Sequence, residues 1–207
     1  MVINEFSASN AFTVADPDFN DYADWIELHN AGSGAVNLRG YCVTDNFDSP
    51  LKWQVPVDTV LGPGEYLLIW ADDRNTGFHT GYKLSAAGEE VALFTPGLEL
   101  LDSVSFSNQV ADVSRGRVTD GSGEWAYFTD PTPGSANNTQ RYADIVFHVP
   151  EFSVSGGHYS GPVTVQLGSG FGGVIRYTRD GSVPVSYTHL RAHETVLDLV
   201  CRLLLEK

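Results

Sequence analysis

The fold of this chain is decided by the run Asp24-Trp25-Ile26-Glu27-Leu28-His29-Asn30 and by the two runs on either side of it. The earlier run is Val2-Ile3-Asn4-Glu5-Phe6-Ser7-Ala8-Ser9-Asn10, and the later one is Val36-Asn37-Leu38-Arg39-Gly40-Tyr41-Cys42-Val43-Thr44-Asp45. Each is a short apolar run that ends on Asn, Asp or Gly, which is typical of a strand entering a turn. The sequence therefore predicts β-structure from its first residues onward.

Strand signals continue to about residue 138 at intervals of roughly 8–15 residues, with no helical period between them, which is typical of a β-sandwich or barrel. Tyr66–Ala71 is apolar at odd and even positions alike, which predicts a central strand with both faces covered. Strand alternation predicts that the following side chains are buried: Ile26, Leu28, Val43, Leu67, Ile69, Leu93, Val104 and Phe106.

Composition and charge limit the classes of function. The chain has 207 residues and a formal net charge of −14, and such a surface repels phosphate backbones and anionic lipid, so we expect no nucleic-acid partner. No apolar run approaches the ~18–20 residues that span a bilayer, so we expect no membrane insertion. The acidity also maintains solubility, without any ligand. Two cysteines do not suggest a disulfide framework, and Cys42 is expected to be a small buried hydrophobe.

Taken together, the runs up to residue 138 resemble the lamin-tail domain, an immunoglobulin-like β-sandwich, in the form found in secreted bacterial proteins. The closing string Pro131-Thr132-Pro133-Gly134-Ser135-Ala136-Asn137 looks like the usual terminus of that bacterial form. The order and number of the matching pieces carry the resemblance. The resemblance implies an all-β fold and a non-catalytic binding or spacer module.

The remaining chain divides into three further parts. Residues 139–149 read as a linker, and residues 150–185 resemble the opening part of the small β-domain attached to bacterial chitobiases and hexosaminidases. The string Ile175–Pro184 is the most specific part of that second resemblance, and its Asp180-Gly181 pair predicts a hairpin turn. Residues 186–207 have helical character and resemble the translated sequencing adapter found at the ends of unrelated metagenomic reading frames, so we expect this short tail to be non-native.

These resemblances imply an accessory module of a secreted or cell-surface bacterial multidomain protein, with a protein or polysaccharide partner. Such modules resemble those found beside spore-coat CotH-type kinase-like domains, nucleases or glycosidases. Met1 directly precedes the first strand, so we expect that leader sequence is missing from this fragment. We expect no enzymatic activity, and the chain has no Gly-x-Ser-x-Gly nucleophile motif. Two alternatives stay open, a carbohydrate-binding module and a hydrolase whose site the sequence does not reveal.

One loop has the composition of a cation site. Its oxygen-bearing side chains lie within nine positions, and Ca²⁺ takes 6–8 hard oxygen ligands. The spacing does not match an EF-hand, and such residues also cap turns in solvated loops without any metal. The sequence predicts a weak calcium site and no other cofactor, with the following candidate ligands: Asp16, Asp18, Asn20, Asp21 and Asp24.

Other polar and aromatic residues give weaker signals. Asp72, Asp73 and Asn75 form a second acidic group, which we interpret as turn residues. The histidines of the β part are isolated in sequence, whereas His189 and His193 are four residues apart in the suspect tail. Among the tryptophans, Trp53 lies between Lys52 and Gln54 and is expected to be the most exposed, which makes it the candidate ligand-binding residue for a glycan.

Overall fold

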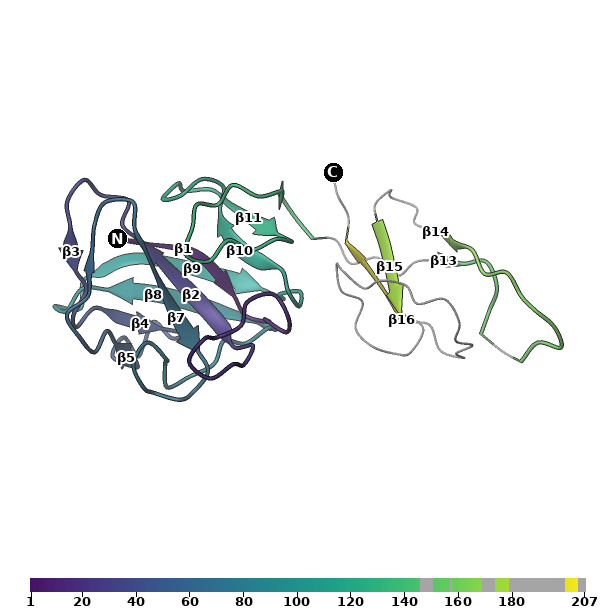
Figure 1. Cartoon of the computed structure of the whole chain (residues 1–207), viewed down its shortest axis with the longest axis horizontal. Coiled ribbons are helices and arrows are strands. Elements are labelled where there is room, and N and C mark those ends of the chain that lie inside the picture. Colours follow the sequence, from purple (N-terminus) through teal and green to yellow (C-terminus); the bar gives the residue numbers. More distant parts are fainter. Residues whose placement is uncertain (146–150, 157, 169–173, 179–199, 205–207) are drawn as a thin grey trace. The chain divides into compact units, whose positions relative to one another are not determined.

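The computed structural model describes residues 1–145, 151–156, 158–168, 174–178 and 200–204 of the chain (Figure 1). The chain divides into two compact units, residues 1–143 and 144–207. Within the described residues no helix is long and apolar enough to cross a membrane, and every assigned element there is a strand.

The first unit is built on a six-stranded antiparallel sheet. Its strand order is β12-β11-β10-β1-β2-β7, so the strands from the two ends of the unit meet at its centre. The registers place Ile3 opposite Leu28 and Ile26 opposite Ile69. The strands are β1 (Val2–Ser7), β2 (Asp24–His29), β7 (Tyr66–Ala71), β10 (Ser114–Arg117), β11 (Trp125–Phe128) and β12 (Arg141–Tyr142).

A four-stranded antiparallel sheet, in the order β5-β4-β8-β9, forms the second layer of the sandwich. Its strands are β4 (Cys42–Thr44), β5 (Trp53–Gln54), β8 (Gly88–Phe94) and β9 (Leu100–Ser107). A short pair, β3 (Val36–Asn37) and β6 (Val60–Leu61), lies outside both sheets. The two sheets are visible in the left-hand part of Figure 1. The predicted all-β, immunoglobulin-like sandwich is confirmed.

The hydrophobic core lies between the inner faces of the two sheets. Ile26 and Leu28 of β2 contribute to it from the larger sheet, and Val43 and Leu93 contribute from the smaller one, all fully buried. Ile69, Val104 and Phe106 are also buried, as alternation predicts. Leu67 is the exception, since it is only half-buried against this core. It lies on β7, at the edge of the sheet, where no further strand covers it.

The prediction that β7 is a central strand is wrong, although its residues do have cover on both faces. On the outer face, Trp70 packs with Trp25 and Ala23, and Val14 of the β1–β2 loop closes this second apolar cluster. The free edge of β7 is met by a loop, because Thr80 N–H donates to Trp70 O at 2.8 Å. A strand therefore has the same apolar sequence pattern whether a loop or another strand covers it.

The rest of the outer face of the larger sheet carries buried acid groups. Glu5 and Glu27 are fully buried, and the segment 131–137 binds both of them. Thr132 donates its backbone N–H and hydroxyl to Glu5, and Gly134 N–H donates to Glu27 Oε2 at 2.6 Å. The string that resembles the usual end of the bacterial domain is therefore part of the folded unit. The sheet continues into the predicted linker, because Tyr142 of β12 pairs with Tyr127.

The second unit has two described strand pairs. β13 (Glu151–Phe152) pairs with β14 (Leu167–Gly168), and β15 (Val174–Thr178) pairs with β16 (Val200–Leu204). The predicted helical character of the tail is wrong for 200–204, because that backbone supplies the antiparallel partner of β15. The Asp180-Gly181 turn, residues 186–199 and His189 and His193 lie outside the described residues.

Candidate functional site

The first half of the candidate site is the loop between β1 and β2, residues 8–23. Asn10 organises it, since its Nδ2 donates to Val14 O at 2.6 Å and to Ala23 O at 2.8 Å. Within the loop a tight turn runs from Asp16 to Asp21, closed by a 2.7 Å hydrogen bond from Asp16 N–H to Asp21 O. The buried Asn10–Ala23 bond joins the two ends of the loop and, with the Asn10–Val14 bond, fixes the acidic turn on the sandwich.

The second half is the loop that follows β7, residues 72–80. Trp70 N–H donates to Phe78 O at 2.8 Å, and Thr80 N–H donates back to Trp70 O, so the two sides of His79 are tied to the edge of β7. Asp72 Oδ1 accepts the Arg74 N–H at 3.1 Å, which confirms the predicted turn role for Asp72. The backbone thus fixes the positions of His79 and Asp72 before their side chains interact.

Charged side chains from the two loops meet in one cluster. His79 lies between two carboxylates, with Nδ1 2.8 Å from Asp72 Oδ2 and Nε2 3.2 Å from Asp18 Oδ2. Arg74 donates to Asp72 Oδ2 at 2.5 Å and to Asp21 Oδ2 at 3.0 Å. The loops, more than fifty residues apart in sequence, are held together by these ion pairs.

The pKa values of three residues in the cluster, Asp21, Asp72 and His79, are shifted in the directions expected for ion pairs. The hydrogen bond from Arg74 lowers the pKa of Asp21. Burial alone would raise the pKa of Asp72, but hydrogen bonds from Arg74 and His79 outweigh it and lower that pKa. Burial alone would also lower the pKa of His79, but its bonds with Asp72 and Asp18 raise it. When no metal ion is bound, the cluster therefore favours ionised Asp21 and Asp72 and a charged His79 imidazole.

Aromatic rings occupy the solvent side of the same loop. Phe12, Phe19 and Tyr22 have exposed fractions of 52%, 46% and 45%. The rings of Phe12 and Tyr22 are 6.0 Å apart, and the Phe19 ring lies 4.9 Å from the imidazole of His79. The Arg74 guanidinium lies over the Phe19 ring at 4.2 Å. We call Phe12, Phe19 and Tyr22 the aromatic loop surface.

The structure brings together only part of the predicted calcium set. Asp16, Asp18 and Asp21 lie around Arg74 and His79, and Asp16 Oδ1 also accepts the Asp18 N–H at 2.9 Å, which is the turn-capping alternative. Asn20 is exposed, in a left-handed conformation with φ 53°.

Asp24 has other surroundings. It begins β2 and accepts the Asn10 N–H, and burial raises its pKa to about 6. Calcium binding by the predicted set stays a prediction.

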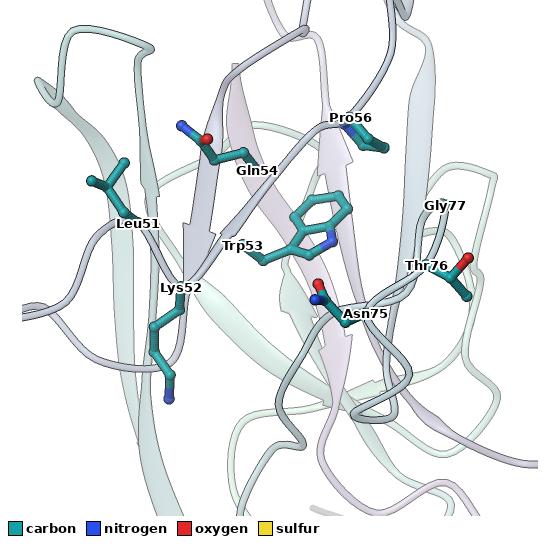
Figure 2. Close-up of a pocket in the computed structure, with 8 residues that line it drawn as sticks. All are labelled: Leu51, Lys52, Trp53, Gln54, Pro56, Asn75, Thr76 and Gly77. Carbon is teal, nitrogen blue, oxygen red and sulfur yellow. The ribbon is translucent and has the colours of Figure 1, made fainter.

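Trp53 is not the exposed aromatic residue that its polar neighbours suggested. It pairs with Val43, a core residue, so both side chains point inward, and Trp53 is 5% exposed. Trp53 nevertheless lines an open pocket of about 190 Å³, which Figure 2 shows between the strand of Gln54 and the loop of Asn75. The pocket is lined by Leu51, Lys52, Trp53, Gln54, Pro56, Asn75, Thr76 and Gly77.

Sequence reasoning missed two groups of residues. His79 and Asp72 were considered separately, because neither has a sequence spacing that indicates a joint site. Glu5 and Glu27 had no predicted role, and both are fully buried. The one sequence signal for this pair was their place inside short apolar runs, where Phe6 follows Glu5, and Ile26 and Leu28 flank Glu27.

The fold places this chain in the class of immunoglobulin-like β-sandwiches. The aromatic loop surface and the charged cluster lie on its loops. A comparison with protein families matches residues 2–108 to the Lamin Tail Domain, so the chain belongs to the lamin tail domain family. The predicted lamin-tail resemblance is thereby confirmed for residues 2–108, whereas its extension to residue 138 and its bacterial form stay predictions. No curated protein and no solved structure matches the chain. The resemblance of residues 150–185 to the chitobiase-type β-domain and the adapter origin of the tail stay predictions.

Proposed function

We propose that this chain is a non-catalytic recognition module of a larger protein, and that the aromatic loop surface contacts its partner. Membership in the lamin tail domain family fits a non-catalytic module in general. The observation that carries the proposal is the exposure of three rings, Phe12, Phe19 and Tyr22, on one loop that is anchored by buried hydrogen bonds. Exposed apolar groups gathered on a fixed loop are typical of an interaction surface.

The anchoring of the loop favours binding energetically. Asp112 Oδ1 accepts the backbone N–H groups of Ala11 and Phe12 at 2.9 and 2.8 Å, so the backbone under the Phe12 ring is fixed before a partner arrives. Aromatic side chains on a fixed backbone lose little conformational entropy when they are buried in an interface. The net charge of −14 favours a neutral or basic partner over an anionic one.

The setting that we propose is a secreted or cell-surface bacterial multidomain protein. The resemblance to the bacterial form of the domain and to the chitobiase-type module in residues 150–185 supports this setting. In such a protein the catalytic residues belong to another domain, of the CotH-like, nuclease or glycosidase type, and this chain acts in attachment, spacing or partner recognition.

A carbohydrate-binding module is the second candidate function, and the aromatic loop surface favours it as well, because sugars stack on exposed rings. The pocket beside Trp53 adds amide and hydroxyl groups from Gln54, Asn75 and Thr76. The indole itself, however, is 5% exposed and offers no flat face to a sugar. A glycan would therefore bind through Phe12 and Tyr22 and not through Trp53.

The experiment compares the full chain with F12A/Y22A, a double variant of the two rings that contact each other. The control is V57A/V60A, which removes exposed apolar groups elsewhere, since Val57 and Val60 are 52% and 63% exposed. Each protein is tested for binding to insoluble chitin, cellulose and peptidoglycan, and to a displayed peptide library. We expect binding by the wild type and the control, and loss in F12A/Y22A.

The ligand that is bound separates the two candidates. Retention on a polysaccharide supports the carbohydrate-binding module, whereas selection of peptides supports protein recognition. Equal binding by F12A/Y22A and the wild type would overturn the role of this surface. Turnover of simple ester, phosphate or glycoside substrates by the purified chain would overturn the non-catalytic assignment.

A further inference from the structure

We propose that Asp16, Asp72 and His79 bind a divalent transition-metal ion, best matched by Zn²⁺, where the 8–23 and 72–80 loops meet. One ligand atom from each residue lies within 4.8 Å of the other two. Asp72 Oδ2 is 2.8 Å and Asp16 Oδ2 is 3.9 Å from the same atom, His79 Nδ1. Ligands of a tetrahedral zinc ion lie roughly 3.4 Å apart, given Zn–N and Zn–O bonds of about 2.0–2.2 Å.

A buried atom without a partner points to the missing cation. Asp16 is fully buried, and its Oδ2 has no hydrogen-bond donor, although it is aimed at His79 and Arg74 at 3.9 and 3.8 Å. A buried carboxylate oxygen without a donor is costly. Arg74 pairs with Asp16, Asp21 and Asp72, and Lys83 adds a positive charge near Asp21, so the four carboxylates of Asp16, Asp18, Asp21 and Asp72 outnumber these two permanent cations. A divalent ion at this point would satisfy Asp16 Oδ2 and reduce the excess negative charge.

The number of ligand atoms that converge here favours zinc over calcium. Asp16 Oδ2 has no donor, and Asp72 Oδ2 and His79 Nδ1 become ligands when the ion replaces the proton that they share. Asp16 Oδ1 and Asp72 Oδ1 are held by the backbone N–H groups of Asp18 and Arg74. Two oxygens and one imidazole nitrogen fall short of the 6–8 oxygens that Ca²⁺ takes. The same set suits a four-coordinate zinc ion that completes its shell with water. The proposed zinc site has Asp16 in common with the predicted calcium set, and its other two ligands are Asp72 and His79.

The second nitrogen of His79 also has the partner that a metal-bound histidine requires. Its Nε2 lies 3.2 Å from Asp18 Oδ2. A metal-binding imidazole commonly donates its other N–H to a carboxylate, which fixes the tautomer and directs the free lone pair at the metal. Asp18 therefore acts as the positioning residue that turns Nδ1 toward Asp16 and Asp72. This inference does not depend on the proposed partner surface.

The test measures metal binding by the tag-free full chain after EDTA treatment and dialysis. Thermal unfolding and calorimetric titration are carried out with ZnCl₂ and, separately, with CaCl₂. We expect Zn²⁺ to bind at this site and to raise Tm, and Ca²⁺ at the same concentration to leave Tm unchanged. In long-range ¹H–¹⁵N NMR spectra, the Nδ1 resonance of His79 should move on zinc addition while its Nε2 stays protonated.

Variants separate this site from adventitious binding elsewhere. H79Q should lose the zinc-dependent rise in Tm, and D18N should weaken zinc binding about 10–100-fold, as the loss of a supporting carboxylate does in other metal sites. The double variant H189A/H193A removes the histidine pair of the tail and should retain the shift. So should D48N, which removes an exposed aspartate outside the cluster.

The variant R74Q tests the zinc proposal even if H79Q does not fold. The Arg74 guanidinium shares Asp72 Oδ2 with the proposed ion, so R74Q should bind zinc more tightly than the wild type. A cluster that is only an ion-pair network would gain no zinc affinity from R74Q. Unchanged zinc affinity in R74Q, a retained Tm shift in folded H79Q, or an equal response to Ca²⁺ would each overturn the proposal. Loss of the shift in H189A/H193A would also do so.

Discussion

Glu5 of β1 and Glu27 of β2 are direct cross-strand partners, and neither side chain is exposed to solvent. The pKa of Glu27 is raised to about 8, chiefly by burial and also by the nearby Glu5 and Asp120, against hydrogen bonds from Asn4 and Gly134 that lower it. Burial also raises the pKa of Glu5. Two buried carboxyl groups side by side favour at least one bound proton.

The raised pKa of Glu27 predicts that the domain loses stability as pH rises from weakly acidic to weakly alkaline. The carboxyl titrates near 4.5 in the unfolded chain and near 8 in the folded one, so the folded state binds more protons in this interval. Its contribution is fully present below about pH 4.5 and is lost by about pH 8, a change on the order of 2–4 kcal/mol. Urea unfolding at several pH values measures it.

Asp21, Asp72 and Asp120 act in the opposite direction at lower pH, since their pKa values are lowered and their contributions are lost on acidification below about 4. We therefore expect maximum stability on the weakly acidic side of neutrality. In E27Q the decline above that maximum should be shallower but not absent, since other groups with raised pKa values, Glu5, Asp24, Glu89 and His79, still titrate. A wild-type stability that is flat over this range would contradict the assignment.

The folded domain should extend well past residue 108, where the family match ends. Residues 109–143 supply β10, β11 and β12 and the segment that binds Glu5 and Glu27. Without them β1 has an unpaired edge, Glu5 loses its donors Ser114 and Thr132, and Glu27 loses Gly134 and keeps Asn4. We expect residues 1–143 to unfold cooperatively in urea and residues 1–108 not to fold, as judged by near-UV circular dichroism.

A point substitution tests, within the full chain, how much the 131–137 segment contributes to the fold. Asn137 Nδ2 donates to Arg117 O at 2.8 Å, and its backbone N–H donates to Asp120 at 3.0 Å. N137A should lower the free energy of unfolding by about 1–3 kcal/mol, because it leaves a buried carbonyl without a donor. A native-like stability of the 1–108 fragment, or of N137A, would contradict a structural role for this segment.

Strand alternation was sufficient to predict the sandwich and most of its core. Ile26, Leu28 and Val43 are buried because their strands place every second residue on the inner face. The place of β7 in the sheet could not be predicted, since its outer face is covered by a loop. A run that is apolar on both faces indicates cover without saying which element provides it.

The acidic half of the candidate site was visible in the sequence, and its partners were not. Asp16 and Asp18 stand out as a dense group in one loop, and a short-range pattern can reveal such a group. His79 and Arg74 reach them only because β2 and β7 are neighbours, which brings together the loop before β2 and the loop after β7. Sequence spacing carries no information on contacts of this range.

Trp53 should behave as a core residue and not as a ligand-binding one. Its side chain belongs to the main hydrophobic cluster, so W53A should lower the free energy of unfolding by about 3–5 kcal/mol, whatever the ligand. The control is L51A, since Leu51 lines the same pocket but is 59% exposed. Urea unfolding measures both, and a W53A variant as stable as L51A would contradict the burial of this indole.

Two arginine–aspartate ion pairs allow a direct comparison. The Arg117–Asp102 pair is nearly buried, and the Arg39–Asp58 pair is exposed. Arg117 Nη2 lies 2.5 Å from Asp102 Oδ2, its Nε donates to Ile3 O at 2.7 Å, and its guanidinium lies over the Trp125 ring at 4.8 Å. Asp102 Oδ2 also accepts the Ile3 N–H at 2.7 Å, so the pair joins β9 of one sheet to β1 of the other.

Removing the nearly buried arginine should therefore weaken the contact between the two sheets. R117A should cost about 3–5 kcal/mol, because it leaves the nearly buried Asp102 carboxylate without its cation and takes the Arg117 donor from the Ile3 carbonyl. Arg39 pairs with Asp58 at 3.2 Å on the surface, with both side chains about two-thirds exposed, and R39A should cost less than about 1 kcal/mol. Chemical unfolding of the two variants under one set of conditions gives the comparison. Equal losses would contradict a role for the Arg117–Asp102 pair in holding the sheets together.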